Sequence, residues 1–279
     1  MRTIGLTALA MLAFAANSVL CRLALGQQLI DPASFAAVRV FTAAATLVAI
    51  VLPRWRARGR SGGNWRSAGV LFAYLVSFSF AYQSLSAGTG ALILFGAAQL
   101  TMIGSALRGG DSFPLLGRAG FVLAVAGLVV LVAPGVTAPS PIGALLMAIA
   151  GLAWGLYSLM GRGDGDPLEV TVNNFIYLVP CVIVLGLVFA ADRHLTLKGL
   201  CFAALSGSLA SGLGYVVWYA AQKRLSAITA ATVQLSVPVV AALGGLVLMT
   251  EPVTLRLVLA SCATLGGIAI VIALRASRR

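Results

Sequence analysis

Long apolar runs follow one another along the whole chain and are separated by short turns rich in Gly, Pro and Arg. A helix that crosses a membrane needs about 20 consecutive apolar residues, and each run has about that length. The pattern therefore predicts an all-α integral membrane protein. Ten transmembrane helices are expected, at about residues 3–24, 33–52, 67–85, 88–107, 115–133, 142–161, 168–190, 199–222, 227–249 and 254–274.

The two halves of the chain carry the same sequence pattern 140 residues apart. Residues 85–91 (LSAGTGA) match residues 225–231 (LSAITAA) at five positions. The same offset carries Phe14 to Trp154, Ser18 to Ser158, Arg22 to Arg162 and Asp111 to Glu251. We interpret the chain as a duplication, with one five-helix repeat in residues 1–138 and a second in residues 139–279. The first apolar run alone resembles a secretory signal peptide, but its partner in the second repeat favours a permanent helix.

The distribution of positive charge predicts the orientation. Cytoplasmic loops of membrane proteins carry the excess of Lys and Arg. With the N-terminus inside, the inner segments hold fourteen Lys and Arg residues and the outer segments hold four. Both termini are therefore expected in the cytoplasm. Because each half has five helices, the second repeat is expected to be inverted relative to the first, which is typical of secondary transporters.

Composition narrows the class of protein. Of the 279 residues, 60% are hydrophobic and 9% are charged, which is typical of a polytopic membrane protein. The net charge of +12 lies in short loops, so it indicates membrane orientation and contact with anionic lipid rather than nucleic-acid binding. The four cysteines have no metal or redox spacing and are interpreted as free thiols. The sequence contains no motif for a metal, a cofactor or a hydrolase site.

The acidic residues predict how transport is coupled. All seven fall in loops or at helix ends: Asp31, Asp111, Asp164, Asp166, Glu169, Asp192 and Glu251. A carboxylate buried in the membrane is a common proton-coupling site, and none of these acids lies in the middle of a predicted span. The sequence therefore indicates a neutral pathway, either without proton coupling or coupled through another kind of group. Asp111 and Glu251 are interpreted as structural caps, with Glu251 opening the last helix.

Arg39 is the one charge that falls well inside a predicted span. A charge at the membrane centre costs about 2.5–3.5 kcal/mol, so this side chain should face protein or water. Two interpretations stay open. Arg39 could pair with a substrate carboxylate, or it could be a structural anchor satisfied by helix-end carbonyls or loop acids. Its position near the outer end of the second helix favours the anchor.

Aromatic side chains form stripes on the third and eighth predicted helices. Tyr74, Phe78 and Tyr82 follow one another at a spacing of four, and Tyr215 and Trp218 share a face of the eighth helix. These stripes are candidates for the lining of a substrate cavity, or for an interfacial aromatic belt.

Polar residues inside other spans are further candidates for substrate contacts. They are Asn17, Gln99, Trp154, Tyr157, Asn173, Asn174 and Gln234. Inside a bilayer each polar group needs a hydrogen-bond partner, and a contact between helices is the alternative interpretation. The pair Asn173 and Asn174 is the favoured functional candidate, because two adjacent amides cannot both face one such contact.

These features resemble a known family. Ten helices in two halves, an aromatic-to-serine pattern in the first and sixth helices (Phe14 to Ser18, Trp154 to Ser158) and an acid before the last helix of each half resemble the EamA repeat. The chain resembles the drug/metabolite transporter superfamily over its whole length, and within it the YddG-type amino-acid exporters. It departs from the family in the fourth helix, where Gln99 lies near the usual proline, whereas Pro238 is present in the ninth. A hinge is therefore expected in the second half only.

The sequence predicts a bacterial inner-membrane transporter that exports amino acids or related small metabolites by alternating access. The resemblance implies no cofactor, a small-molecule substrate, contact with membrane lipids and a monomeric state. The turns at residues 86–89 and 226–229 are candidate gates at opposite mouths of the pathway. Three alternatives remain: a lipophilic-cation exporter, which should carry a membrane carboxylate; a nucleotide-sugar or phosphate-ester antiporter, which needs several basic residues in its helices; and a membrane enzyme, which needs clustered catalytic groups.

Overall fold

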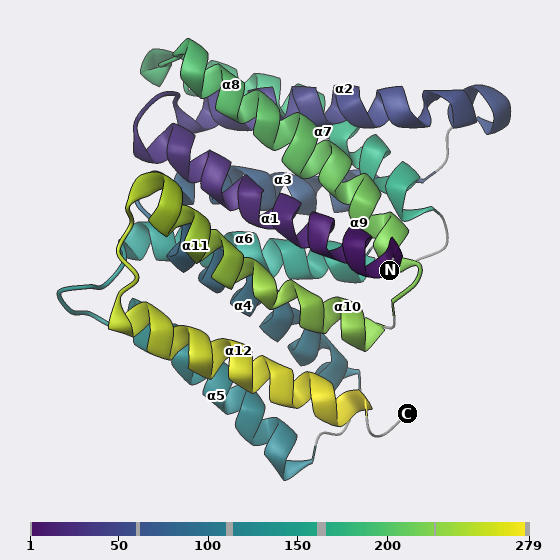
Figure 1. The fold of residues 1–279 in the computed structure, drawn as a ribbon. Helices are drawn as coiled ribbons and strands as arrows, with labels where there is room; N and C mark the ends of the chain where they lie inside the picture. Colours follow the sequence, from purple (N-terminus) through teal and green to yellow (C-terminus); the bar gives the residue numbers. More distant parts are fainter. Residues whose placement is uncertain (1, 60–61, 110–113, 161–165, 226, 277–279) are drawn as a thin grey trace.

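A computed structural model describes residues 2–59, 62–109, 114–160, 166–225 and 227–276, and in it the chain forms a bundle of helices (Figure 1). The first half contains α1 (Arg2–Gly26), α2 (Pro32–Arg58), α3 (Trp65–Ala81), α4 (Ala87–Arg108) and α5 (Leu115–Val132). The second half contains α6 (Pro141–Met160), α7 (Pro167–Val188), η1 (Ala190–Asp192), α8 (Leu197–Leu205), η2 (Ser206–Leu213), α9 (Gly214–Gln222), α10 (Ala227–Gln234), α11 (Ser236–Met249) and α12 (Leu255–Ala276).

Within the described residues, nine helical runs are long and apolar enough to cross a membrane. The helix α3, with 17 residues, is slightly shorter. When α3 is included, the crossings number ten, as the hydropathy pattern predicts. Large apolar side chains such as Val188 (71% exposed) and Val247 (76% exposed) cover the outside of the bundle, which is the surface expected against lipid. The chain is therefore a multi-pass membrane protein.

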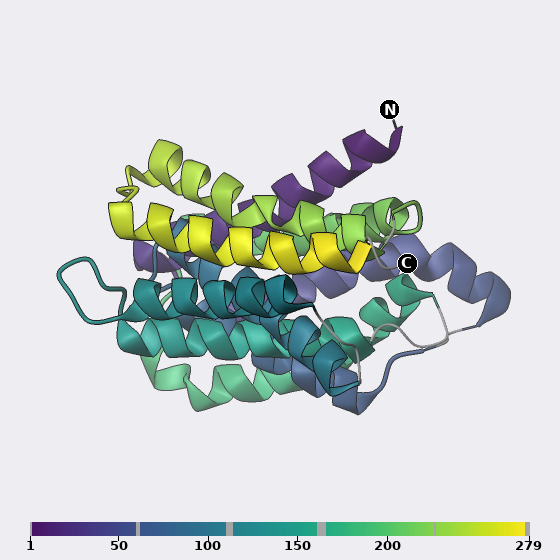
Figure 2. The ribbon, with the colours of Figure 1, turned by 90° about the horizontal axis from the view of Figure 1, so that it is seen from below.

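The bundle has two ends, and each is named here after an arginine that lies there. We call one the Arg54 end; it holds the start of α1 and the ends of α2, α4, α9 and α12 (right in Figures 1 and 2). The opposite end, here the Arg22 end, holds the connections between α1 and α2, α3 and α4, and α11 and α12. The chain thus starts and finishes its described part at the same end.

Side-chain caps fix where several helices begin. Asp31 accepts from Ser34 N–H at 2.8 Å and so caps α2, and Asn64 caps α3 in the same way. The hydroxyl of Ser86 accepts from Thr89 N–H at 3.3 Å, which makes this part of the predicted gate turn the N-cap of α4. Each cap satisfies a backbone donor that would otherwise be buried without a partner.

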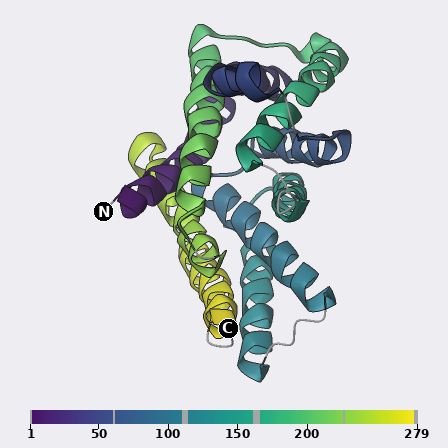
Figure 3. The same cartoon turned by 90° about the vertical axis from the view of Figure 1, so that its right-hand side faces the viewer.

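Small residues let the helices approach closely. The helices α5 and α12 lie side by side at one edge of the bundle, far from α2 (Figures 1 and 3). A methyl group added to Gly120 would lie 2.8 Å from the carbonyl oxygen of Gly267, so neither position has room for a larger side chain. Elsewhere α1 packs on α9, α3 on α6, α2 on α7, and α4 on α11.

Two crossings of the second half are irregular: the eighth, which the sequence pattern predicts to be continuous, and the ninth, where Pro238 predicts a hinge. The eighth crossing changes to a π-helix over η2, between α8 and α9. The ninth crossing is interrupted at Leu235, between α10 and α11. Pro238 lacks the N–H that would bond the Gln234 carbonyl and its ring clashes with that group, which accounts for the interruption. The first-half counterpart α4 is continuous through Gln99, so the interruption lies in the half where a hinge is expected.

Candidate functional site

A hollow with a volume of about 470 Å³, which is within the range of small-molecule sites, lies in the described part of the bundle. It lies among α4, α6, α7, α9 and α10. Its lining includes Pro167 at the start of α7, Gln222 at the end of α9, and Leu225 beyond it, so the hollow reaches the Arg54 end. We call it the main cavity. None of its described lining residues is charged.

A chain of hydrogen bonds fixes the tyrosines of the main cavity. The hydroxyls of Tyr157 and Tyr219 lie 3.2 and 2.7 Å from the hydroxyl of Thr171. The amide nitrogen of Asn174 donates to the Tyr157 hydroxyl at 3.1 Å. These bonds orient the two phenol rings, and the wall therefore presents aromatic faces and a few hydroxyl and amide groups.

A smaller hollow of about 20 Å³ lies deeper, among α1, α2, α3, α4, α6, η2 and α9. We call it the inner pocket. It is lined by Phe14, Asn17, Ser18, Arg39, Tyr74, Phe78, Leu94, Phe95, Trp154, Ala210, Ser211 and Tyr215. Trp154 lines both hollows, and its ring lies 5.1 Å from Tyr74 and 5.9 Å from both Tyr157 and Tyr215, between ring centres. Trp154 and the rings around it thus lie at the boundary that the two hollows share.

Arg39 lies in the wall of the inner pocket and is 1% exposed. Its Nε donates to the Ser211 hydroxyl at 3.1 Å, and its Nη2 donates to the Tyr74 hydroxyl at 3.2 Å. The guanidinium carbon lies 4.9 Å from the ring centre of Phe78 and 5.6 Å from that of Tyr74, within the range of cation–π contacts. The predicted anchors, helix-end carbonyls or loop acids, are not its partners among the described residues.

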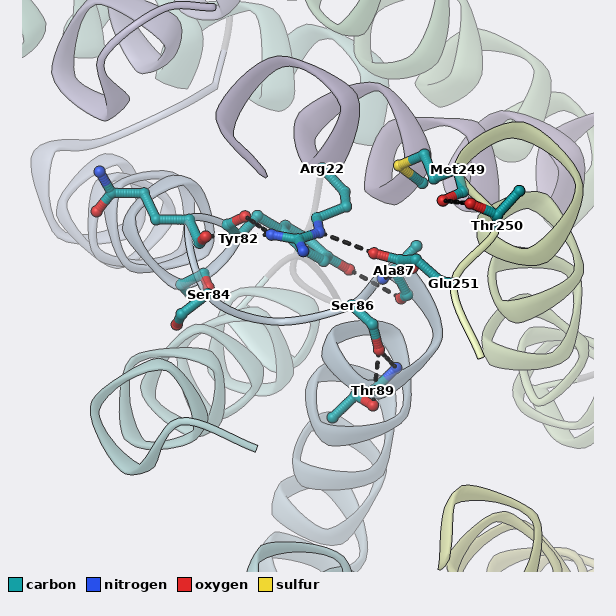
Figure 4. A network of polar contacts seen from close by, with 11 residues as sticks. Arg22, Tyr82, Ser84, Ser86, Ala87, Thr89, Met249, Thr250 and Glu251 are labelled. Carbon is teal, nitrogen blue, oxygen red and sulfur yellow. Dashed lines mark hydrogen bonds and ion pairs between the residues drawn. The ribbon is translucent and has the colours of Figure 1, made fainter. Parts of the chain in front are cut away.

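The Arg22 end is closed by polar contacts between the two halves (Figure 4). Arg22 on α1 pairs with Glu251, with 2.8 Å between Nε and Oε1. Its Nη1 also donates to the carbonyls of Tyr82 and Gln83, and Glu251 Oε2 accepts from Ala87 N–H at 2.8 Å. The prediction that Glu251 opens the last helix is therefore wrong. Glu251 precedes α12 and instead satisfies the N-terminus of α4, where a carboxylate is favoured.

Close backbone packing surrounds this ion pair. A methyl group on Gly88 would lie 2.6 Å from Cβ of Ala242, and one on Gly244 would lie 2.7 Å from a methyl of Val19. Tyr82, fully buried, donates to the Ala87 carbonyl at 3.3 Å. The described structure is thus open toward the Arg54 end and closed at the Arg22 end.

The structure brings most of the sequence-based candidates together. Those that line one or both hollows are Asn17, Arg39, Tyr74, Phe78, Trp154, Tyr157, Tyr215, Trp218 and Gln234. Four candidates lie outside both linings: Tyr82, Gln99, Asn173 and Asn174. Gln99 donates to the Ala231 carbonyl at 3.3 Å. Asp111 and Arg162 lie outside the described residues.

The two asparagines of α7 join it to neighbouring segments. Asn173 donates to the Gly62 carbonyl at 2.9 Å, and Asn174 accepts from Asn64 N–H and from the Ser67 hydroxyl at 3.2 and 3.0 Å. The two adjacent amides do face different contacts, as expected, but both contacts are with protein.

Several lining residues are absent from the sequence-based candidates, notably Phe14, Ser18, Ser158, Thr171 and Ser211. The repeat could have identified three of them. Phe14 corresponds to Trp154, and Ser18 to Ser158, and all four positions line a hollow. Thr171 and Ser211 have no counterpart of their own kind at the offset of 140 and carry no such signal.

Comparison with known proteins agrees with this architecture. Residues 141–273 match the EamA-like transporter family. A Pseudomonas aeruginosa protein, "Uncharacterized protein PA1977", is 50% identical over 277 residues, which cover 99% of this chain and 96% of that protein. An Archaeoglobus fulgidus protein described as an uncharacterized transporter is 25% identical over 262 residues, covering 87% of this chain and 89% of its own.

One solved crystal structure is similar over 97% of both chains, with a TM-score of 0.66 and 20% sequence identity, and this similarity shows a shared fold. The second half of the chain thus resembles a transporter family, and the apolar helices indicate a multi-pass membrane protein. The chain belongs to one family with the Pseudomonas aeruginosa protein and carries an EamA-like transporter domain over residues 141–273.

Proposed function

We propose that this protein exports amino acids or related small metabolites across the bacterial inner membrane, as a monomer and by alternating access. The observation that carries the proposal is the main cavity of about 470 Å³, which opens at one end of the bundle while the other end is sealed. An amino acid is small enough for such a cavity. Aromatic faces with a few hydroxyl and amide groups suit small amphipathic molecules and favour broad rather than narrow selectivity.

The charge distribution supports a cytoplasmic position for the open mouth. The Arg54 end carries the arginines at the end of α2 together with Arg66, Arg108, Lys223 and Arg224. Such an excess is typical of the cytoplasmic face. In this orientation the cavity receives substrate from the cytoplasm, and the Arg22–Glu251 contact forms the outer closure.

The packing of the helices supports a symmetric pair of states. The contact of α1 with α9 corresponds, under exchange of the two halves, to the contact of α6 with α3. The contacts of α2 with α7, α4 with α11 and α5 with α12 each map onto themselves. Two inverted repeats of this kind allow the pathway to close at one end and open at the other, with the substrate site between the halves.

The lining supports transport without a buried proton-carrying carboxylate. Neither hollow has Asp, Glu, His or Lys among its described lining residues. Substrate would then move down its own concentration gradient.

Purified protein in liposomes tests this proposal. Uptake of a labelled amino acid by counterflow, with equal pH on both sides, is the expected result. Uptake that requires a pH gradient would contradict the uncoupled mechanism. Transport of a lipophilic cation, with no amino acid moved, would replace the substrate class with that of the multidrug exporters.

A further inference from the structure

We propose that Arg39 binds a carboxylate group of the transported molecule, so that the inner pocket is the anion-binding end of the substrate site. This inference rests on the proposed function, because it names the charged group of the substrate that the main cavity admits. It assigns to Arg39 the recognition role and sets aside the purely structural one.

The hydrogen bonds of Arg39 leave one part of the guanidinium without a partner. Nε and Nη2 donate to Ser211 and Tyr74, as described above. Nη1 is buried and has no hydrogen-bond acceptor among the described residues. A guanidinium carries five N–H donors, two of them on Nη1, and a buried donor without an acceptor is unfavourable by the full loss of its hydration. An acceptor is therefore missing from this site.

The charge of Arg39 is also not neutralised. The two ion pairs found among the described residues involve Arg22 and Arg54, not Arg39. The rings of Phe78 and Tyr74 stabilise the cation only in part, because the cation–π attraction does not remove its net charge. An arginine buried inside a membrane protein normally meets an anion. A monoanionic ligand would supply both the missing acceptor and the missing charge.

The space beside Arg39 suits one oxygen of a carboxylate group. The inner pocket, of about 20 Å³, has room for about one water-sized group, such as a single carboxylate oxygen. Guanidinium groups prefer carboxylates because the planar fork of donors matches the two oxygens. Since Trp154 lines both hollows, a ligand anchored at Arg39 would continue past the indole ring into the main cavity.

Ligand binding at Arg39 would also be linked to the position of η2 in the second half. Ser211, which accepts from Arg39 Nε, belongs to η2, and Ser206 at the start of η2 donates to the Asn17 amide oxygen at 2.6 Å. A carboxylate on Nη1 would thus lie against α1, α2 and η2 together. Amides, esters and lipophilic cations lack the required anion and should bind weakly.

The first experiment compares two probes of nearly equal shape on the purified full-length protein. Binding of phenylacetate and of the neutral phenylacetamide is measured by calorimetry and by thermal stabilisation in detergent, at constant ionic strength. We expect phenylacetate to bind at least about tenfold more tightly, the factor of one charge-assisted hydrogen bond. Equal affinities, or no binding of phenylacetate, would overturn the proposal and leave a solvated or structural arginine. Equal competition by chloride would overturn the carboxylate assignment.

Substitutions test whether Arg39 causes the preference for phenylacetate over phenylacetamide. Arg39→Gln should remove the difference between the two probes, whereas Arg39→Lys should keep a reduced preference, because a cation remains but the fork of donors is lost. Arg193→Gln removes an exposed arginine of the Arg22 end and serves as the matched control with unchanged preference. A preference that persists in Arg39→Gln would contradict the assignment. Should Arg39→Gln fail to fold, the Arg39→Lys variant and the wild-type comparison decide.

This test is separate from the test of transport. If wild-type protein discriminates between the probes through Arg39 but moves no amino acid in liposomes, the transport proposal fails and the anion site stands. If amino acids are transported and Arg39→Gln shows the same discrimination as the wild type, the anion site fails and the transport proposal stands.

Discussion

Arg22 and Glu251, which are 229 positions apart in the chain, form a 2.8 Å ion pair that joins the two halves of the protein. The second carboxylate oxygen of Glu251 accepts from the backbone of Ala87, at the N-terminus of α4 (Figure 4). One carboxylate therefore connects α1, α4 and the segment before α12. If the Arg22 end opens during transport, these contacts must break together.

Glu251→Gln should weaken this closure. The substitution keeps the size of the side chain but removes the charge, with an expected shift of roughly 1–3 kcal/mol, or about five- to 150-fold, toward the open state. Cys21 is a native reporter, because it is fully buried and adjoins Arg22. In intact cells, a membrane-impermeant maleimide added outside should label Cys21 faster in the variant than in the wild-type protein.

The labelling experiment needs a background in which the other cysteines, Cys181, Cys201 and Cys262, are replaced by Ser, because Cys181 is half-buried and the other two are exposed. Arg193→Gln, which also removes one charge from the same end, is the control and should leave the labelling rate unchanged. Equal labelling in Glu251→Gln and wild type would show that the ion pair does not hold the closure. Labelling only after the membrane is permeabilised would place the Arg22 end in the cytoplasm instead.

Gly88→Val should prevent the same closure by size rather than charge. Its side chain would lie against Ala242, since even a methyl group there comes within 2.6 Å of Cβ and 2.9 Å of Cα. The added volume should hold α4 away from α11, raise Cys21 labelling and reduce counterflow. Gly69→Val is the matched control, because Gly69 also lies in a helix but has no atom within 4 Å of the added position. Similar labelling and transport in the two valine variants would argue against a steric role for this contact.

The sequence could predict much of the site because the duplicated positions share a face of each helix. Asn17 and Tyr157 form one pair at the offset of 140, and Phe78 and Trp218 another. In both pairs the first residue lines the inner pocket and the second lines the main cavity. The two repeats lie around the same space, and equivalent helices turn the same face toward it. Positions that match between the repeats therefore indicate residues that line this space.

The remaining contacts depend on loops whose position the hydropathy pattern does not determine. Asn174 looks like a substrate ligand because no partner is visible nearby in the sequence. Its partners lie 107 and 110 positions earlier, at Ser67 and Asn64 around the start of α3. The sequence assigns Glu251 to its own helix for the same reason, since local cap rules consider only neighbours along the chain.

Asn174→Leu should therefore destabilise the protein without changing its selectivity. The substitution keeps a similar volume but removes the acceptor of Ser67 and Asn64 and a donor to Tyr157, each worth about 1 kcal/mol or more when its partner stays buried. We expect a lower midpoint of thermal unfolding and an unchanged ratio of phenylacetate to phenylacetamide binding. A change in that ratio with normal stability would return Asn174 to the list of substrate contacts.

The π-helix η2 is the element that the sequence predicts least well. Its position follows from its packing against α2. Gly207 lies against the Arg39 carbonyl and the Thr42 hydroxyl, and Gly212 lies against Thr46. The wide turn of a π-helix inserts an extra residue and re-aims the side chains that follow it. Here it places Ser211 on Arg39 while Tyr215 remains in the inner pocket wall. The position of η2 depends on its packing against α2, so the hydropathy of its own sequence does not reveal it.

Gly207→Ala tests whether η2 must lie directly on α2. A methyl group at this position has no space beside Thr42 and the Arg39 backbone, so η2 must shift, at a cost of about 1–3 kcal/mol. The shift should also move Ser211 from Arg39, and we expect a lower unfolding midpoint together with weaker phenylacetate binding. Gly69→Ala, at an open helical position, should be neutral or slightly stabilising. An unfolding midpoint for Gly207→Ala at or above that of Gly69→Ala would mean that stability does not require the close contact between η2 and α2. This contact would then not couple Arg39 to η2.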